Sequence, residues 1–232
     1  PIIGSLFSIV IAKMLFGGLG QNFINPALAG RAFLVASYPT LMTGSAFGPT
    51  SFMKGVDAAT YATPLAQIKE AGALNTSFVD LLVGNCGGTI GETCAIALIL
   101  GGIYLIVKKV ISWRTPVVYI ATVLVLTYIF KLSGIEAASA RQPIQELFAG
   151  GLMLGAFFMA TDYASTPVTP KGKIIMGLGC GIITVLIRVF GGYPEGVSYS
   201  ILLMNLAAPL IDRYTAPKKF GYVKPVKVKE VK

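Results

Sequence analysis

Long apolar runs without charge alternate along this chain with short segments that contain Gly, Lys, Arg or Asp. Several runs have only about 15 or 16 uncharged residues, a little under the roughly 20 that a membrane-spanning helix needs. Flanking Lys and Arg side chains can reach the interface and make up the difference. The pattern predicts an all-α integral membrane protein, a polytopic helical bundle of about seven spans: 1–16, 24–44, 90–107, 115–131, 146–161, 174–190 and 196–211.

The spans define one transmembrane helical domain over residues 1–212, followed by a basic tail at 213–232. Its longest connection, about 45–89, is rich in Gly, Thr, Ser and Ala. The first residue, Pro1, lies inside an apolar stretch with no initiator Met, so we expect further N-terminal spans to be missing.

Gly-rich turns border the spans, and irregular backbone at membrane depth is stable only where protein or a cavity satisfies its polar groups. Two of these turns begin with a Gly-Gly pair, at 17 and at 191, and each is followed by an Asn-containing span. This similarity hints at an inverted repeat, as in many transporters.

Composition excludes an ordinary water-soluble domain, because 54% of the residues are hydrophobic, only 12% are charged, and the mean hydropathy is +0.74. The net charge of +9 follows the membrane topology, since cytoplasmic loops carry the excess of Lys and Arg. Twelve basic residues lie in the tail and in the connections 108–114 and 162–173, against three in the opposite connections. We therefore expect a cytoplasmic C-terminus, an outer 45–89 loop, the lipid bilayer as a partner, and no nucleic acid.

The chain contains three cysteines and no histidine. Neither a Cys₄ cluster nor a His-based haem or zinc site can be built from these residues, so no metal site is expected. A redox role would need another cofactor.

One such cofactor is suggested by the stretch D-A-A-T-Y-A-T-P-L at 57–65. It resembles the signature at which FMN is joined through its phosphate to a threonine, here Thr63. The resemblance extends over nearly the whole chain, through GQNFINPALAGRAF, GNCGGTIGET, KKVISWRTPVVYI, FMATD, TPKGK, LIRVFGGYPEGVSYSILLMN and APLID. Together these segments resemble the D subunit of Rnf-type ion-translocating ferredoxin:NAD oxidoreductase complexes, and they are also similar to the B subunit of the sodium-translocating NADH:quinone reductase.

The resemblance implies a membrane flavoprotein that carries electrons within a complex coupled to Na⁺ or H⁺ translocation. It would be part of a translocase and not catalytic alone. The implied cofactors are covalent FMN and a second, noncovalent flavin such as riboflavin. The implied partners are the other subunits of the complex, including a second covalent-FMN subunit, and a flavin transferase. The implied location is the prokaryotic inner membrane, with the Thr63 loop outside.

Thr63 followed by Pro64 is also the ordinary start of a helix, with Thr as N-cap and Pro as the first helical residue. The two interpretations are compatible, because the N-terminus of a helix favours a phosphate. Asp57 and Thr60 would then be recognised by the transferase or cap the backbone locally.

Further cofactor-binding candidates are Arg31, Asn22 and Asn85. An Arg within a span is costly in lipid, so Arg31 should face the protein interior or extend to the membrane surface. The two Asn residues lie in Gly-rich turns, where Asn often serves the turn itself.

Acidic residues at span ends are candidates for a cation pathway, although such residues are usually solvated. Asp162, Glu195 and Asp212 match the resembled family, and Glu92 lies just before an apolar span. A different class of function, a solute channel or secondary transporter without a redox cofactor, also fits Gly-broken helices with few charges. Only the flavin motif and its flanking segments favour the flavoprotein.

Overall fold

The computed structural model describes residues 1–18, 20–42, 63–71, 76–89, 91–134 and 142–217, and every element in these ranges is helical. Two helices are long and apolar enough to cross a membrane by length and composition, α7 (Arg114–Leu132) and α11 (Pro170–Phe190). Shorter apolar helices run over Ile2–Phe16, Pro26–Ser37 and Ala95–Val107. The all-helical class is thus confirmed for the described residues, while the number of spans and the inverted repeat stay predictions.

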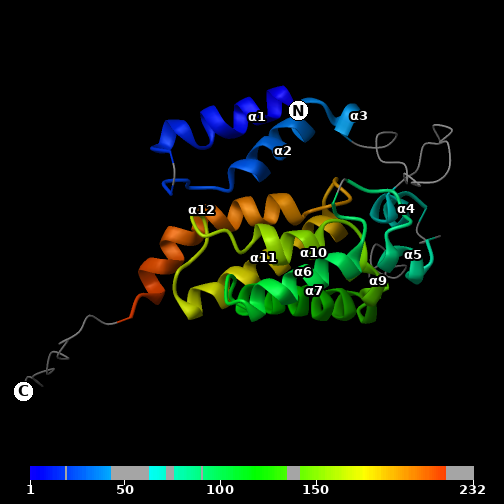
Figure 1. The fold of residues 1–232 in the computed structure, drawn as a ribbon. Helices are drawn as coiled ribbons and strands as arrows, with labels where there is room; N and C mark the ends of the chain where they lie inside the picture. The colour runs from blue at the N-terminus through cyan, green and yellow to red at the C-terminus, as the bar shows by residue number, and fades with distance from the viewer. Residues whose placement is uncertain (19, 43–62, 72–75, 90, 135–141, 218–232) are drawn as a thin grey trace, which may run out of the picture.

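The first predicted span consists of three consecutive helical pieces, α1 (Ile2–Leu6), η1 (Phe7–Ile11) and η2 (Met14–Phe16). They lie against α2 (Pro26–Ser37), as Figure 1 shows. A Cβ on Gly30 would lie 2.0 Å from Ser8 Oγ, and the rings of Phe7 and Phe33 stack at 4.2 Å. Small residues on both sides therefore allow a close approach of the two segments.

The second predicted span, 24–44, is interrupted, because α2 ends at Ser37 and a short α3 (Pro39–Met42) follows. Proline disfavours the helical conformation of the preceding residue, and Tyr38 has φ −132° and ψ 58°. The helix start matches its sequence signals, since Asn25 Oδ1 accepts hydrogen bonds from the N–H groups of Ala27 and Leu28.

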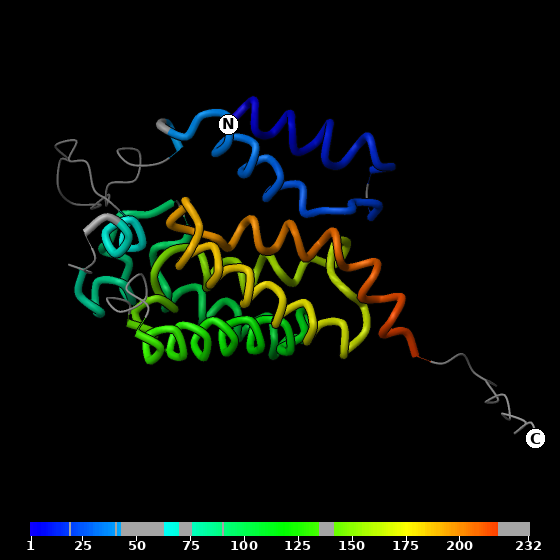
Figure 2. Tube along the Cα trace, turned by 180° about the vertical axis from the view of Figure 1, so that it is seen from behind, coloured from blue at the N-terminus to red at the C-terminus, as the bar shows by residue number. Residues whose placement is uncertain are grey.

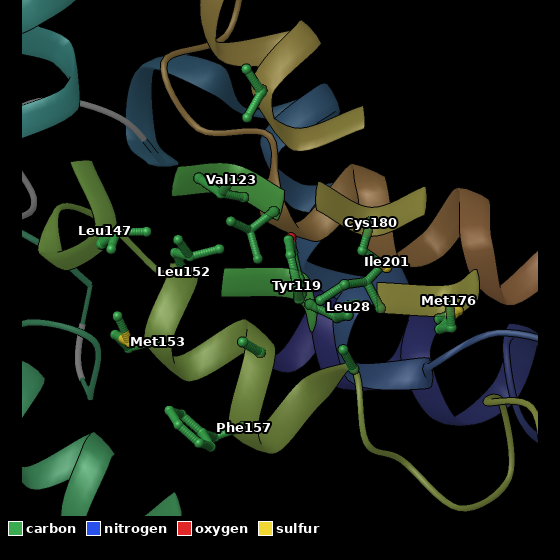
Figure 3. Close-up of a cluster of buried hydrophobic side chains, with 14 of the residues drawn as sticks. Leu28, Tyr119, Val123, Leu147, Leu152, Met153, Phe157, Met176, Cys180 and Ile201 are labelled. Atoms are coloured by element: carbon green, nitrogen blue, oxygen red, sulfur yellow. The ribbon is translucent and has the colours of Figure 1, made fainter. Parts of the chain in front are cut away.

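The centre of the bundle is formed by α7, α11 and α12 (Val197–Thr215), with α2 packed on the outer side of α12 (Figure 2). Leu28, Tyr119, Cys180 and Ile201 meet in the apolar core between these helices (Figure 3). The buried Tyr119 hydroxyl lies 2.6 Å from Thr184 Oγ1, and 3.0 Å from the hydroxyl of a serine on α12.

The predicted span 146–161 is wrong as one continuous helix. The segment consists of α9 (Pro143–Phe148), α10 (Leu152–Leu154) and η4 (Gly155–Met159), and the chain turns at Gly150, whose φ is +68°. Glycine adopts this left-handed conformation without the cost of a Cβ. The buried Arg188 of α11 donates to the carbonyl groups of Glu146 and Ala149, at 3.0 and 3.3 Å, where α9 ends.

Two short helices, α4 (Pro64–Ala71) and α5 (Phe78–Val83), occupy the predicted outer loop. They lie at one end of the bundle, opposite the C-terminal end of α12 (Figure 1). Large apolar side chains remain exposed on α6 (Ala95–Val107), α7 and α12, including Leu100, Val125 and Leu206. Such apolar surface is typical of contact with lipid or with other subunits.

Candidate functional site

Thr63 lies at the N-terminus of α4. Its Oγ1 accepts a hydrogen bond from the N–H of Ala66 at 3.3 Å, and its carbonyl accepts from Gln67 N at 2.9 Å. The predicted N-cap at Thr63 and helix start at Pro64 are therefore confirmed. The side chain is half-buried, so its hydroxyl is both positioned by the backbone and open to modification.

Helix α4 is held against the bundle by its apolar face and by one lysine. Leu65 and Ile68 are buried, and they join Leu81 and Ala149 in a small apolar cluster. Lys69 Nζ donates to the carbonyl of Gly191. These contacts fix Thr63 beside the break in the α9–α10 segment and the turn that precedes α12.

An ion pair joins α2 to that same turn. Arg31 Nη2 donates to Glu195 Oε2 at 2.9 Å, and Arg31 Nη1 donates to Ser198 Oγ at 3.0 Å. The other carboxylate oxygen, Glu195 Oε1, accepts from the N–H of Gly151 at 2.8 Å. Arg31 therefore lies against an interior partner, and Glu195 binds both α2 and the broken segment.

Glu92 is the second acid of this group. It lies in the turn before α6, is only 6% exposed, and places Oε2 3.8 Å from Arg31 Nη2. Its Oε1 accepts from the N–H of Thr89 at 3.1 Å, whereas the buried Oε2 has no hydrogen-bond partner among the described residues. Sequence reasoning identified Glu92 only as an acid before an apolar span and missed its pairing with residues far away in the chain.

Two adjacent glycines lie between these acids and α4. A Cβ on Gly151 would lie 2.5 Å from Glu195 Oε1 and 3.0 Å from Glu92 Oε2. A Cβ on Gly150 would lie 2.6 Å from Leu65 Cδ1 and 3.8 Å from Glu195 Oε1. The two carboxyl groups therefore converge at Gly151, and the first turn of α4 is their neighbour.

The predicted asparagine candidates do not gather at Thr63 through any described contact. Asn22 Oδ1 is buried without a hydrogen-bond partner among the described residues. The exposed Asn85 follows α5, where its Nδ2 donates to Asp80 Oδ1 at 3.3 Å. Burial raises the pKa of the neighbouring Cys86 thiol, and the carboxylates of Glu92 and Asp80 raise it further. Asp57 and Thr60 lie outside the described residues.

Two of the three predicted cation-pathway acids lie together, away from the third. Asp162 Oδ2 accepts from Ser165 Oγ at 2.7 Å, and Asp212 accepts from the N–H of Val168 at 3.1 Å. Both acids therefore hold the connection before α11. Asp212 lies ~22 Å along the axis of α12 from its first residue, at 1.5 Å per residue, whereas Glu195 lies just before that helix.

The comparisons with known proteins agree with the resemblance in the sequence. The model of the NQR2, RnfD, RnfE family matches residues 1–221. The chain is 52% identical over 227 residues to the D subunit of the Na⁺-translocating ferredoxin:NAD⁺ oxidoreductase complex of Acetobacterium woodii, covering 96% of this chain and 67% of the relative.

Two further relatives have similar names. The chain is 50% identical over 228 residues to the D subunit of the proton-translocating ferredoxin:NAD⁺ oxidoreductase complex of Clostridium ljungdahlii, covering 94% of this chain and 67% of the relative. It is 37% identical over 238 residues to the D subunit of the ion-translocating oxidoreductase complex of Pseudomonas paraeruginosa, covering 96% and 69%. The chain therefore belongs to the NQR2, RnfD, RnfE family, and its resemblance to the D subunit of Rnf-type complexes is confirmed.

Proposed function

We propose that this chain carries electrons within an Rnf-type ferredoxin:NAD oxidoreductase complex, through FMN attached to Thr63 by a phosphoester. The observation that carries the proposal is the placement of the Thr63 hydroxyl at the start of α4. The names of the relatives support membership of such a complex, so the other subunits would be its partners. A flavin transferase would be needed for maturation, and one partner would be a second covalent-FMN subunit.

The residues around Thr63 fit a phosphate. The first turn of α4 presents N–H groups that have no partner within the helix, and the positive end of the helix dipole lies there. Pro64 has no N–H, so the donors available to a phosphate are those of Leu65 and Ala66. Esterified on Thr63, the phosphate would lie where this helix favours an anion. When bound, the flavin supplies the electron transfer.

Other residues complete the proposal. Asp57 and Thr60 would be read by the transferase, and Arg31 and Asn85 would lie on the flavin side of the bundle. The unpartnered, buried Oδ1 of Asn22 would accept a hydrogen bond from a second, noncovalent flavin such as riboflavin. Asp162, Glu195 and Asp212 remain proposed for a Na⁺ or H⁺ pathway.

A spectrum of the denatured chain tests the proposed function. Purified from the native complex and precipitated with acid, the chain should keep a yellow chromophore that fluoresces in a denaturing gel. A phosphoester survives denaturation, whereas a noncovalent flavin is released into the supernatant. A colourless, nonfluorescent chain from a complex with native flavin in its other subunits would favour the transporter alternative instead.

The orientation is also proposed, from the distribution of basic residues. We expect a cysteine introduced at Thr76, just before α5, to react with a membrane-impermeant maleimide from the outer side of intact cells. A cysteine at the exposed Tyr214, near the end of α12, should react only after the membrane is opened. The native cysteines are replaced by serine in both variants, and the reverse labelling pattern would place Thr63 in the cytoplasm.

A further inference from the structure

The group formed by Arg31, Glu92 and Glu195 contains two carboxyl groups and one guanidinium. Arg31 and Glu195 are well matched at 2.9 Å, and both oxygens of Glu195 have donors. Glu92 is farther from Arg31, at 3.8 Å, and its side chain is 5% exposed. An ionised Glu92 would therefore be a second, nearly uncompensated negative charge out of water, which is costly.

The hydrogen bonds of Glu92 show which oxygen is affected. Oε1 accepts from Thr89 N, and Oε2 is the buried atom without a hydrogen-bond partner among the described residues. That oxygen points to the same place as Glu195 Oε1, since both lie within 3.0 Å of the position of a Cβ on Gly151. A proton on Glu92 Oε2 would remove the excess charge and face an acceptor on Glu195.

We infer that Glu92 and Glu195 form a carboxyl pair that holds one exchangeable proton. The proton comes from water and converts one carboxylate into a carboxylic acid, so no other bond changes. Two like charges at this separation favour a single shared proton. The charged or titratable groups facing Glu92 among the described residues are Arg31 from α2, Glu195 from the turn before α12, and Cys86 from the turn after α5.

The carboxyl pair is also placed to respond to charge at α4. Leu65 of α4 contacts Gly150, which adjoins Gly151 in the chain and lies beside Glu195. An electron delivered to a flavin on Thr63 by a reduced centre elsewhere in the complex would add negative charge here. The pair would then bind its proton more tightly and take one up from water if it were empty. This linkage, but not the shared proton itself, rests on the proposed function.

Infrared difference spectroscopy of the purified complex tests the shared proton. Spectra recorded against a pH reference should contain the carbonyl stretch of a protonated carboxylic acid, shifted by deuterium oxide and by ¹³C-carboxyl glutamate. Glu92→Gln should remove this band. Asp80→Asn should leave it, because Asp80 accepts from the exposed Asn85 and is not a member of the pair.

Three further arms make each outcome decisive. Glu92→Asp keeps an acid and should shift the band without removing it, which covers a Gln variant that fails to assemble. Exchange of K⁺ for Na⁺ at constant pH should leave the band unchanged, and a loss of the band on adding Na⁺ would overturn the proposal in favour of a metal-cation site. Thr63→Ala should leave the pH-dependent band and abolish only its response to reduction. A wild-type complex without a glutamic acid band at any pH would refute the shared proton, whatever the flavin does.

Discussion

Replacing Thr63 with alanine will abolish the in-gel flavin fluorescence of the denatured chain. The phosphoester requires the side-chain oxygen, which alanine lacks, and a valine variant should behave in the same way. The change also removes the hydrogen bond from Ala66 N to Thr63 Oγ1. Loss of such an N-cap costs about 0.5–2 kcal/mol, so the amount of protein can fall, but fluorescence per molecule cannot vanish for that reason.

Matched variants separate attachment from folding. Thr63→Ser keeps a hydroxyl and the N-cap, and it should be modified more slowly. Thr60→Ala should reduce attachment only in part, because the transferase would read this residue without esterifying it. Thr76→Ala removes a hydroxyl that bonds to Gln67 at 3.3 Å, and it should leave fluorescence per molecule unchanged. Acid-stable flavin on the Thr63→Ala chain, normalised for protein, would show that the attachment residue is another one.

The second large effect concerns the contact between α7 and α11. A Cβ on Gly177 would lie 2.9 Å from the carbonyl oxygen of Thr115 and 3.2 Å from Tyr119 N, both backbone atoms of α7. Backbone cannot yield without moving the whole helix. We expect Gly177→Ala to lower the free energy of unfolding by about 1–3 kcal/mol, the usual cost of overpacking.

Gly179 provides the control within the same helix. A Cβ there would lie 2.4 Å from the Cε and Sδ atoms of Met204, the flexible end of a side chain that can adopt another rotamer. Both substitutions improve helix propensity equally, by up to about 1 kcal/mol, so their difference reports packing. Unfolding is followed by a thiol-reactive dye on the fully buried Cys180, with Cys86 and Cys94 replaced by serine. Equal unfolding temperatures of the two variants would contradict the tight contact.

Sequence reasoning predicted the bodies of the long helices well and their ends less well. The span predicted at 115–131 is α7 at Arg114–Leu132, because uncharged residues and helix coincide there. The span predicted from 174 starts at Pro170 instead, since Thr169 caps α11 by accepting from Gly172 N. Hydropathy ends a run at a charged residue, whereas capping decides where the helix begins.

The candidate site was predictable only where its contacts are local. The cap at Thr63 involves residues within one helical turn, so the Thr-Pro pair was sufficient to find it. The convergence of Glu92 and Glu195 with Arg31 depends on three segments far apart in the chain, and no local pattern specifies it. The turn within 146–161 did have a signal, the adjacent Gly150 and Gly151, but an apolar average over the segment hides it.

The hydrogen bonds from Arg188 to the carbonyls of Glu146 and Ala149 have a consequence for sequence divergence. A helix that ends inside a bundle leaves carbonyl groups that water cannot reach. Here a guanidinium on another helix takes the place of the missing N–H donors. Lysine has neither the fork nor the fixed spacing to serve two carbonyls at once. Residue 188 and the glycines at 150 and 151 should therefore drift together, so that a relative with a continuous helix at this position would have lost its arginine as well.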